Sequence, residues 1–136
     1  MVDLVVTAAN VQPGATGASQ TTGTAGAAIT AGQVVYLDSA TSTYKLAKAN
    51  VVAANAPVGI ALNGAAIGQP VTVLTAGPIT AGATLAPGIG YYLSPTNAGG
   101  ICAVADLAVG SYPSFLGFAT SATSLAVKVQ QAGVSL

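Results

Sequence analysis

The chain has no histidine, tryptophan, glutamate or arginine, and its 136 residues include only three acidic and three basic side chains. Without histidine or glutamate, the serine and threonine hydroxyls have no obvious general base to activate them as nucleophiles. Nucleic-acid binding needs clustered lysine and arginine to neutralise phosphates, and three scattered lysines do not supply them. We therefore predict a protein that is neither an enzyme nor a nucleic-acid binder.

The same shortage limits metal and redox chemistry. Three aspartates without histidine or glutamate do not make a convincing transition-metal site, so we predict no metal and no cofactor; a carbonyl-rich calcium site at an oligomer axis stays open. Cys102 is the only cysteine and cannot form an internal disulfide. We expect a small buried thiol there, with pairing between chains as the alternative.

Charge is missing altogether between residues 49 and 105, but asparagine, glutamine and proline interrupt this stretch. No window offers the ~20 apolar residues that a membrane-spanning helix requires. The first residues include an acid where a secretory signal needs positive charge. We expect a soluble protein made in the cytoplasm, without membrane contact, and the net charge of zero favours association into assemblies.

What the chain does contain is a β-sheet pattern that occurs twice. Residues 32–38 (GQVVYLD) return as 88–94 (GIGYYLS), residues 58–62 (VGIAL) as 116–120 (LGFAT), and residues 71–73 (VTV) as 127–129 (VKV). The offsets are 56, 58 and 56 residues. Three segments that keep their order and nearly their spacing indicate the duplication of one β unit, with repeats at about 29–77 and 85–133.

Short apolar stretches separated by turn residues predict an all-β fold, a small β-barrel or β-sandwich built from the duplicated unit. In the last repeat segment, alternation places Val127 and Val129 toward the core and Lys128 and Gln130 toward water. Residues 63–64 (NG) and 97–100 (NAGG) predict hairpin turns. Residues 47–56 are the only helix candidate, of one turn at most.

Residues 1–28 differ from the rest, because Gly, Ala, Thr and Ser dominate after a short apolar start. Such a composition does not order itself alone. We interpret it as an extended N-terminal arm that adds a strand to a neighbour's sheet, or as a first strand followed by a linker, before a single β domain at 29–136. The candidate contact residues of the arm are Val2, Leu4, Val5, Val6 and Val11.

Two further sites each have a functional and a structural interpretation. Asp38 follows an apolar run, as the catalytic aspartates of aspartic proteases do, but that chemistry needs two carboxylates and the matching position is Ser94. A turn-capping role for Asp38 is therefore expected. Tyr91 and Tyr92 could stack on a sugar ring, whereas their correspondence with the segment at Tyr36 favours a structural role.

Residues 31–38 (AGQVVYLD) and 58–71 (VGIALNGAAIGQPV), followed by 91–94 (YYLS) and 99–101 (GGI), resemble the capsid decoration proteins of tailed bacteriophages, also described as structural cement or head fibre proteins. The resemblance runs from about residue 29 to the end of the chain. Its glycines and small residues describe tight β turns, which unrelated β modules can share.

The resemblance implies a virion protein on the outer surface of an expanded capsid, made in the cytoplasm of a bacterial host. It would bridge neighbouring major capsid subunits and form a homo-oligomer, with a trimer favoured over a dimer. No catalytic residues belong to that role. The alternative is a β-rich adhesion or saccharide-binding module of a phage tail or cell surface, acting through Tyr91 and Tyr92.

Overall fold

The computed structural model describes residues 4, 6–13, 18–49, 56–103, 107 and 112–131, and the predicted all-β class is confirmed. In this part of the chain the one helical element is a single 3₁₀ turn, η1 (Ala8–Asn10). The strands are β1 (Val11–Pro13), β2 (Ser19–Thr24), β3 (Val34–Asp38), β4 (Thr43–Leu46), β5 (Gly59–Ala61), β6 (Pro70–Ala81), β7 (Gly90–Leu93), β8 (Ile101–Ala103), β9 (Ser114–Ala119) and β10 (Ser124–Gln131).

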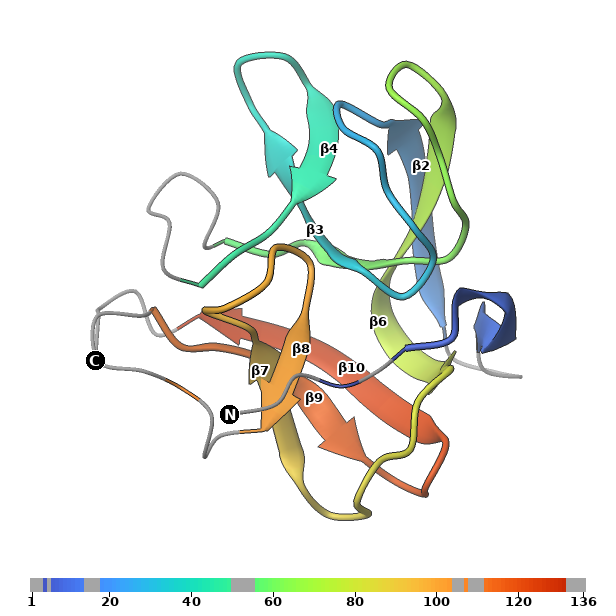
Figure 1. Cartoon of the computed structure of the whole chain (residues 1–136), viewed down its shortest axis with the longest axis vertical. Helices are drawn as coiled ribbons and strands as arrows, with labels where there is room; N and C mark the ends of the chain where they lie inside the picture. The colour runs from blue at the N-terminus through green and yellow to red at the C-terminus, as the bar shows by residue number, and fades with distance from the viewer. Residues whose placement is uncertain are drawn as a thin grey trace.

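The strand order of the sheet reflects the duplication. Neighbouring strands follow the order β4-β3-β5-β6-β10-β9-β7-β8, and all pairings between these strands are antiparallel. The order is therefore the same from either end: a first unit of β3 to β6 and a second unit of β7 to β10. Figure 1 shows the first unit above the second, with the long strand β6 passing from one to the other.

The registers of the two units also correspond. Val34 and Val35 pair with Ile60 and Gly59 in the first unit. Gly90 and Tyr91 pair in the same way with Phe118 and Gly117 in the second. These pairs reproduce the sequence offsets of 56 and 58, because a register that buries one face of a strand is strongly specified.

The third predicted correspondence, of residues 71–73 with 127–129, is displaced in the sheet. Ile60 pairs with Leu74, whereas its counterpart Phe118 pairs with Ala126, an offset of 52. The chain between the paired residues Ile60 and Leu74 is correspondingly six residues longer than that between Phe118 and Ala126, and β10 carries a bulge after Val127. Residues 71–73 and 127–129 are therefore both parts of β strands, as the alternation predicted, but they do not occupy equivalent positions in the pairing of the two units.

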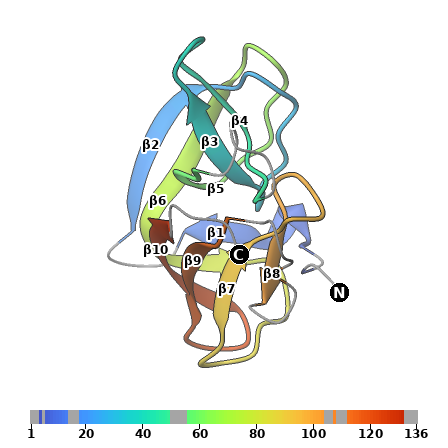
Figure 2. The same cartoon turned by 90° about the vertical axis from the view of Figure 1, so that its left-hand side faces the viewer.

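The N-terminal segment belongs to the same sheet. Ala76 of β6 pairs with both β2 and β10, so these two strands lie on opposite edges of β6. By the same argument β1 lies opposite β10, because both pair with Ile79, and so β1 and β2 follow one another along one edge. Figure 2 shows β2 beside the first unit and β1 beside the second. The part of residues 1–28 that the structure describes is therefore built largely into the domain.

Two apolar clusters fill the two units. A smaller cluster lies inside the first unit. It contains Ala25 of the N-terminal segment, which forms a β-bridge with Tyr44, and the buried side chains of Val35, Ala61 and Val73. A larger cluster lies inside the second unit. It also includes Val34, Ile60 and Leu74, which alternate with the previous set along the first unit's strands. The first unit is thus buried on both faces, which positions the second unit against it.

Two glycines allow the strands within each unit to approach closely. A Cβ atom at Gly59 would collide with the carbonyl oxygen of Leu74, and one at Gly117 would collide with that of Ala126. The colliding residues are equivalent in the two units. These positions require glycine because the backbone of the next strand occupies the space of a side chain.

Both predicted hairpins form, with one change in their turn chemistry. β7 pairs with β8 around residues 97–100, and β5 pairs with β6. The second connection is not a tight turn at Asn63, because the Asn63 side chain instead accepts from Thr72 N at 2.7 Å and donates to Pro70 O at 3.2 Å. The left-handed residue of this loop is Gly68, with φ of +86°. Residues 47–49 and 56 are not helical, and the rest of the helix candidate lies outside the described residues.

Candidate functional site

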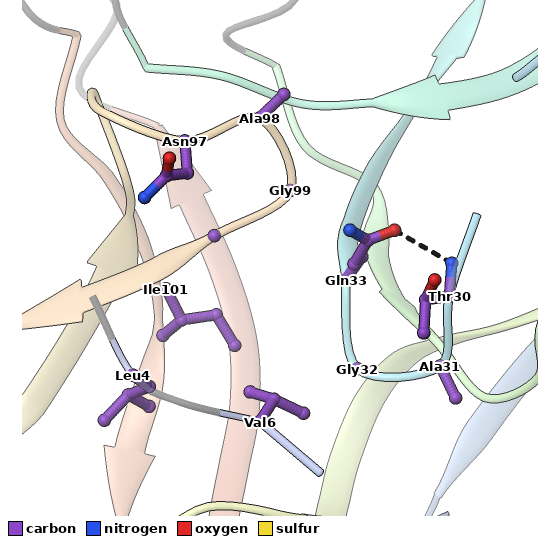
Figure 3. Close-up of a pocket in the computed structure, with 11 residues that line it drawn as sticks. Leu4, Val6, Thr30, Ala31, Gly32, Gln33, Asn97, Ala98, Gly99 and Ile101 are labelled. Carbon is purple, nitrogen blue, oxygen red and sulfur yellow. Dashed lines mark hydrogen bonds between the residues drawn. The ribbon is translucent and has the colours of Figure 1, made fainter. Parts of the chain in front are cut away.

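A groove of about 260 Å³ lies where the N-terminal segment meets the two units (Figure 3). Leu4 and Val6 form one side, residues 30–33 before β3 form the second, and residues 97–101 before β8 form the third. The groove therefore needs all three segments, which are far apart in the sequence. Its walls come from short loops that the strands hold at both ends.

Hydrogen bonds fix the loop at residues 97–101 to the first unit. Gly99 N donates to Ala47 O at 2.6 Å, and Val34 N donates to Gly99 O at 2.9 Å. Within the other loop, Gln33 Oε1 accepts from Thr30 N at 2.8 Å. Gly32 and Gly99 have φ of +91° and +75°, so each loop turns at a residue for which a side chain would be strained.

The chemistry of this groove is that of an uncharged surface. Apolar side chains of Leu4, Val6 and Ile101 face amide and hydroxyl groups of Gln33, Asn97 and Thr30. Among the described residues that line it, none is acidic, basic or a cysteine. Such a groove can hold an uncharged group by burial and hydrogen bonding.

The predicted arm residues lie in different places. Val11 is 7% exposed and belongs to the larger core cluster, while Leu4 and Val6 are half-buried and pack against it. Leu4 N also donates to Ile101 O of β8 at 2.8 Å. Val2 and Val5 lie outside the described residues. The three described side chains thus contact the domain that carries them.

Asp38 is the turn-capping residue that the sequence predicted. Its carboxylate accepts from Ala40 N at 3.0 Å and forms an ion pair with Lys45 Nζ at 2.7 Å across the β3–β4 hairpin. The hydrogen bond from Lys45, aided by that from Ala40, lowers the pKa of Asp38 below its ordinary value. The same pair raises the pKa of Lys45. The ion pair lies near the surface and joins the two strands of the hairpin.

Ser94 is buried, and its hydroxyl oxygen accepts from Thr96 N at 3.0 Å and from Asn97 N at 3.2 Å. It therefore shapes the loop that forms one wall of the groove. Cys102 is a buried thiol, as predicted, with its sulfur 3.9 Å from Leu93 O.

The aromatic residues of the second unit divide into the buried Tyr91 and a partly exposed set. Tyr91 is 5% exposed, and its hydroxyl oxygen accepts from Ala86 N at 3.0 Å, so its ring is not available to a sugar. Tyr92 points to the other face, where its ring centroid lies 5.5 Å from that of Phe115 at an interplanar angle of 70°. Phe115 contacts Phe118 at 5.5 Å, and Phe118 is 53% exposed. We call Tyr92, Phe115 and Phe118 the aromatic face.

Sequence reasoning singled out Tyr91 and Tyr92 but missed Phe115 and Phe118 as surface residues. The available signal was the alternation in residues 117–119, where Gly117 and Ala119 are buried on either side of the exposed Phe118. Reading it required knowing which face of β9 is covered, and only the packing of the units decides that.

Within the described part of the chain, no three His, Cys, Asp or Glu side chains cluster as metal ligands would. No helix among those residues has the length and hydropathy to cross a membrane. Comparisons with protein families, with curated proteins and with solved structures found no match to this chain.

Proposed function

We propose that this chain is a structural virion protein that binds the outer surface of an expanded phage capsid and stabilises it by bridging major capsid subunits. The observation that carries the proposal is that the segments resembling capsid decoration proteins coincide with structural elements. Residues 31–38 form the loop before β3 and the strand itself, and residues 58–71 form β5, the long connection and the start of β6.

The surface chemistry supports a binding role. Ser19–Thr24 of β2 presents serine, glutamine and threonine side chains that are mostly exposed, and none is charged. The exposed surface therefore offers hydrogen-bonding groups without long-range electrostatic repulsion. A lattice of identical subunits presents the same contact many times, so weak contacts suffice when several copies act together.

One exposed side chain has the features of an anchor. Ile67 is 74% exposed at the tip of the β5–β6 connection, and the turn beneath it is held in place. Gly68 N donates to Ala25 O at 2.8 Å, Ala25 N donates to Gln69 O at 2.9 Å, and Ala66 N donates to Gln69 Oε1 at 2.9 Å. A side chain held ready in this way loses little conformational entropy when a partner buries it.

In mechanical terms, the protein would stabilise the shell by mass action. A protein that binds the expanded lattice and not the free subunits lowers the free energy of the lattice by an amount that grows with its concentration. No step of this mechanism needs a reacting side chain. Contact through Leu4, Val6 or Val11 would first require the N-terminal segment to leave its own core, so we place the main contact on Ile67 and its turn.

The proposal is tested by co-sedimentation of the purified protein with expanded shells that lack it. Saturation at a fixed small-integer ratio to the major capsid protein is expected. Ile67→Ser should weaken attachment by about tenfold or more, as expected for loss of a buried aliphatic anchor. Ile89→Ser, which changes a side chain 42% exposed in the second unit, is the matched control and should bind normally. Absence of binding by the unmodified chain would reject the capsid role.

A further inference from the structure

Because the two units are similar, each surface of the second unit can be compared with the equivalent surface of the first. The face that carries Gly90, Phe118 and Ala126 corresponds, by strand pairing, to the face of the first unit that carries Val34, Ile60 and Leu74. In the first unit these three side chains are 0%, 1% and 0% exposed. They are covered because the second unit packs its core against them.

In the second unit the described residues leave the corresponding face partly open. Phe118 takes the position of Ile60 and is 53% exposed. Gly90, in the position of Val34, leaves space that the Phe115 ring approaches, since a Cβ atom there would lie 3.0 Å from Phe115 Cε1. The outer face of the second unit therefore has the apolar character of a packed interface, while no described part of the chain covers it.

We propose that the aromatic face of Tyr92, Phe115 and Phe118 is a self-association surface that packs against the same face of a second copy of this chain. The precedent is the first unit, whose equivalent face is covered by β structure from this same chain. Charge does not oppose the contact strongly, because Lys128 is the single charged residue in the described part of the second unit and the whole chain has no net charge.

The ring geometry favours a protein partner over a sugar. Sugar stacking needs one broad exposed ring, but Tyr92 meets Phe115 nearly edge to face and Phe118 is tilted by 55° from Phe115. Rings arranged in this way form an uneven apolar surface of the kind that interdigitates when two sheets pack. A contact between identical faces is isologous, so it pairs copies two by two and does not build a trimer.

Pairing through the aromatic face depends on the proposed capsid role in one respect only, which is that this role leads us to expect oligomers. Self-association is measured without any shell. Failure of the pairing therefore leaves the capsid proposal standing, and failure of shell binding leaves the pairing standing.

The experiment is sedimentation equilibrium of the full chain over a concentration series, with circular dichroism to verify folding. The unmodified protein should show a reversible monomer–dimer equilibrium. Phe118→Ser should raise the dimer dissociation constant at least about tenfold, as for loss of a central aromatic anchor, and Phe118→Lys should raise it further because like charges then face one another. Leu37→Ser, at an exposed apolar residue of the first unit, should leave it unchanged.

A protein that is monomeric at every concentration would overturn the proposal, as would a dimer or trimer that both Phe118 variants leave intact. Loss of shell attachment in Phe118→Ser from a protein that stays monomeric would assign the face to the capsid and overturn pairing. Loss of binding to a glycan array from such a monomer would likewise overturn it in favour of a saccharide. An interchain disulfide in Phe118→Cys, formed in the dimer while Cys102 remains buried, would support it independently.

Discussion

The two units share strand order and pairing, yet they differ in how many of their faces are buried. Val35 and its counterpart Tyr91 both point into a core. Ile60 and its counterpart Phe118 do not share an environment, because one is buried between the units and the other is exposed. Duplication therefore gives both units the same backbone pattern. What covers the equivalent face differs, because the second unit packs against that face of the first unit, while the same face of the second unit points outward.

The loops differ in the same way. The β5–β6 connection of the first unit is long and presents Ile67, whereas the β9–β10 connection consists of residues 120–123. In the shorter loop the Ser121 hydroxyl oxygen accepts from Thr123 N at 3.2 Å and from Ser124 N at 3.1 Å. The first unit thus carries its most exposed large apolar side chain, Ile67, in a loop, and the second carries its most exposed one, Phe118, on a strand.

The largest expected effect breaks what the units share. Gly59→Val and Gly117→Val each place a side chain where a backbone carbonyl lies, so each should cost at least about 3 kcal/mol and prevent stable folding. Chemical denaturation measures the loss. Gly64→Ala is the control, because its Cβ atom would meet nothing closer than 3.6 Å. Equal stability of the Gly59 and Gly64 variants would contradict the close approach.

The next effect sharpens the difference between the units. Ile60→Ala should destabilise the protein by about 2–5 kcal/mol, because it leaves a cavity between two cores. Phe118→Ala, at the equivalent position, should cost less than about 1 kcal/mol in the monomer, because the ring is already half in water. The two free energies of unfolding are compared below the concentration at which copies associate. A cost at Phe118 as large as that at Ile60 would mean that its face is covered within the monomer.

A smaller effect tests whether the N-terminal segment is part of the second unit's core. Val11→Ala removes buried apolar surface beside β6 and should cost roughly 1.5–3 kcal/mol. Gln12→Ala, in the same strand but exposed, is the control and should change stability little. If thermal unfolding of the two variants is the same, residues 11–13 act as a free arm and contribute nothing to the domain.

The smallest effect concerns the ion pair of the first unit's β3–β4 hairpin. The pKa of Asp38 is lower in the folded state than in the unfolded chain. The ion pair therefore stabilises the fold at pH values above the ordinary aspartate pKa. This stabilisation is lost as the pH falls through the pKa that Asp38 has in the folded state. The pair is only partly buried and lies close to water, so Asp38→Asn should lower the melting temperature slightly at neutral pH. Melting curves across acidic pH should show the difference from the unmodified protein disappearing. A constant difference at all pH values would assign the effect to packing.

The sequence alone determined the β class, the duplication, the two equivalent glycines, the buried thiol and the capping aspartate. Each depends on residue type and local spacing, such as a glycine repeated at matching positions or a carboxylate two residues before a turn N–H. Local chemistry of this kind does not depend on which distant segment lies nearby.

Only the tertiary structure decided four features: the pairing of the last strand of each unit (β6 and β10), the place of the N-terminal segment, the groove and the aromatic face. Residues 71–73 and 127–129 look alike in sequence, but loop length and a bulge set their register. Leu4, Val6 and Val11 are apolar whether they form an arm or pack in a domain. Val11 lies in the core and the other two pack against it, because this removes their apolar surface from water. Phe118 and Ile60 occupy the same place in the repeat, and their burial differs because the second unit covers the first and no described residue covers the second.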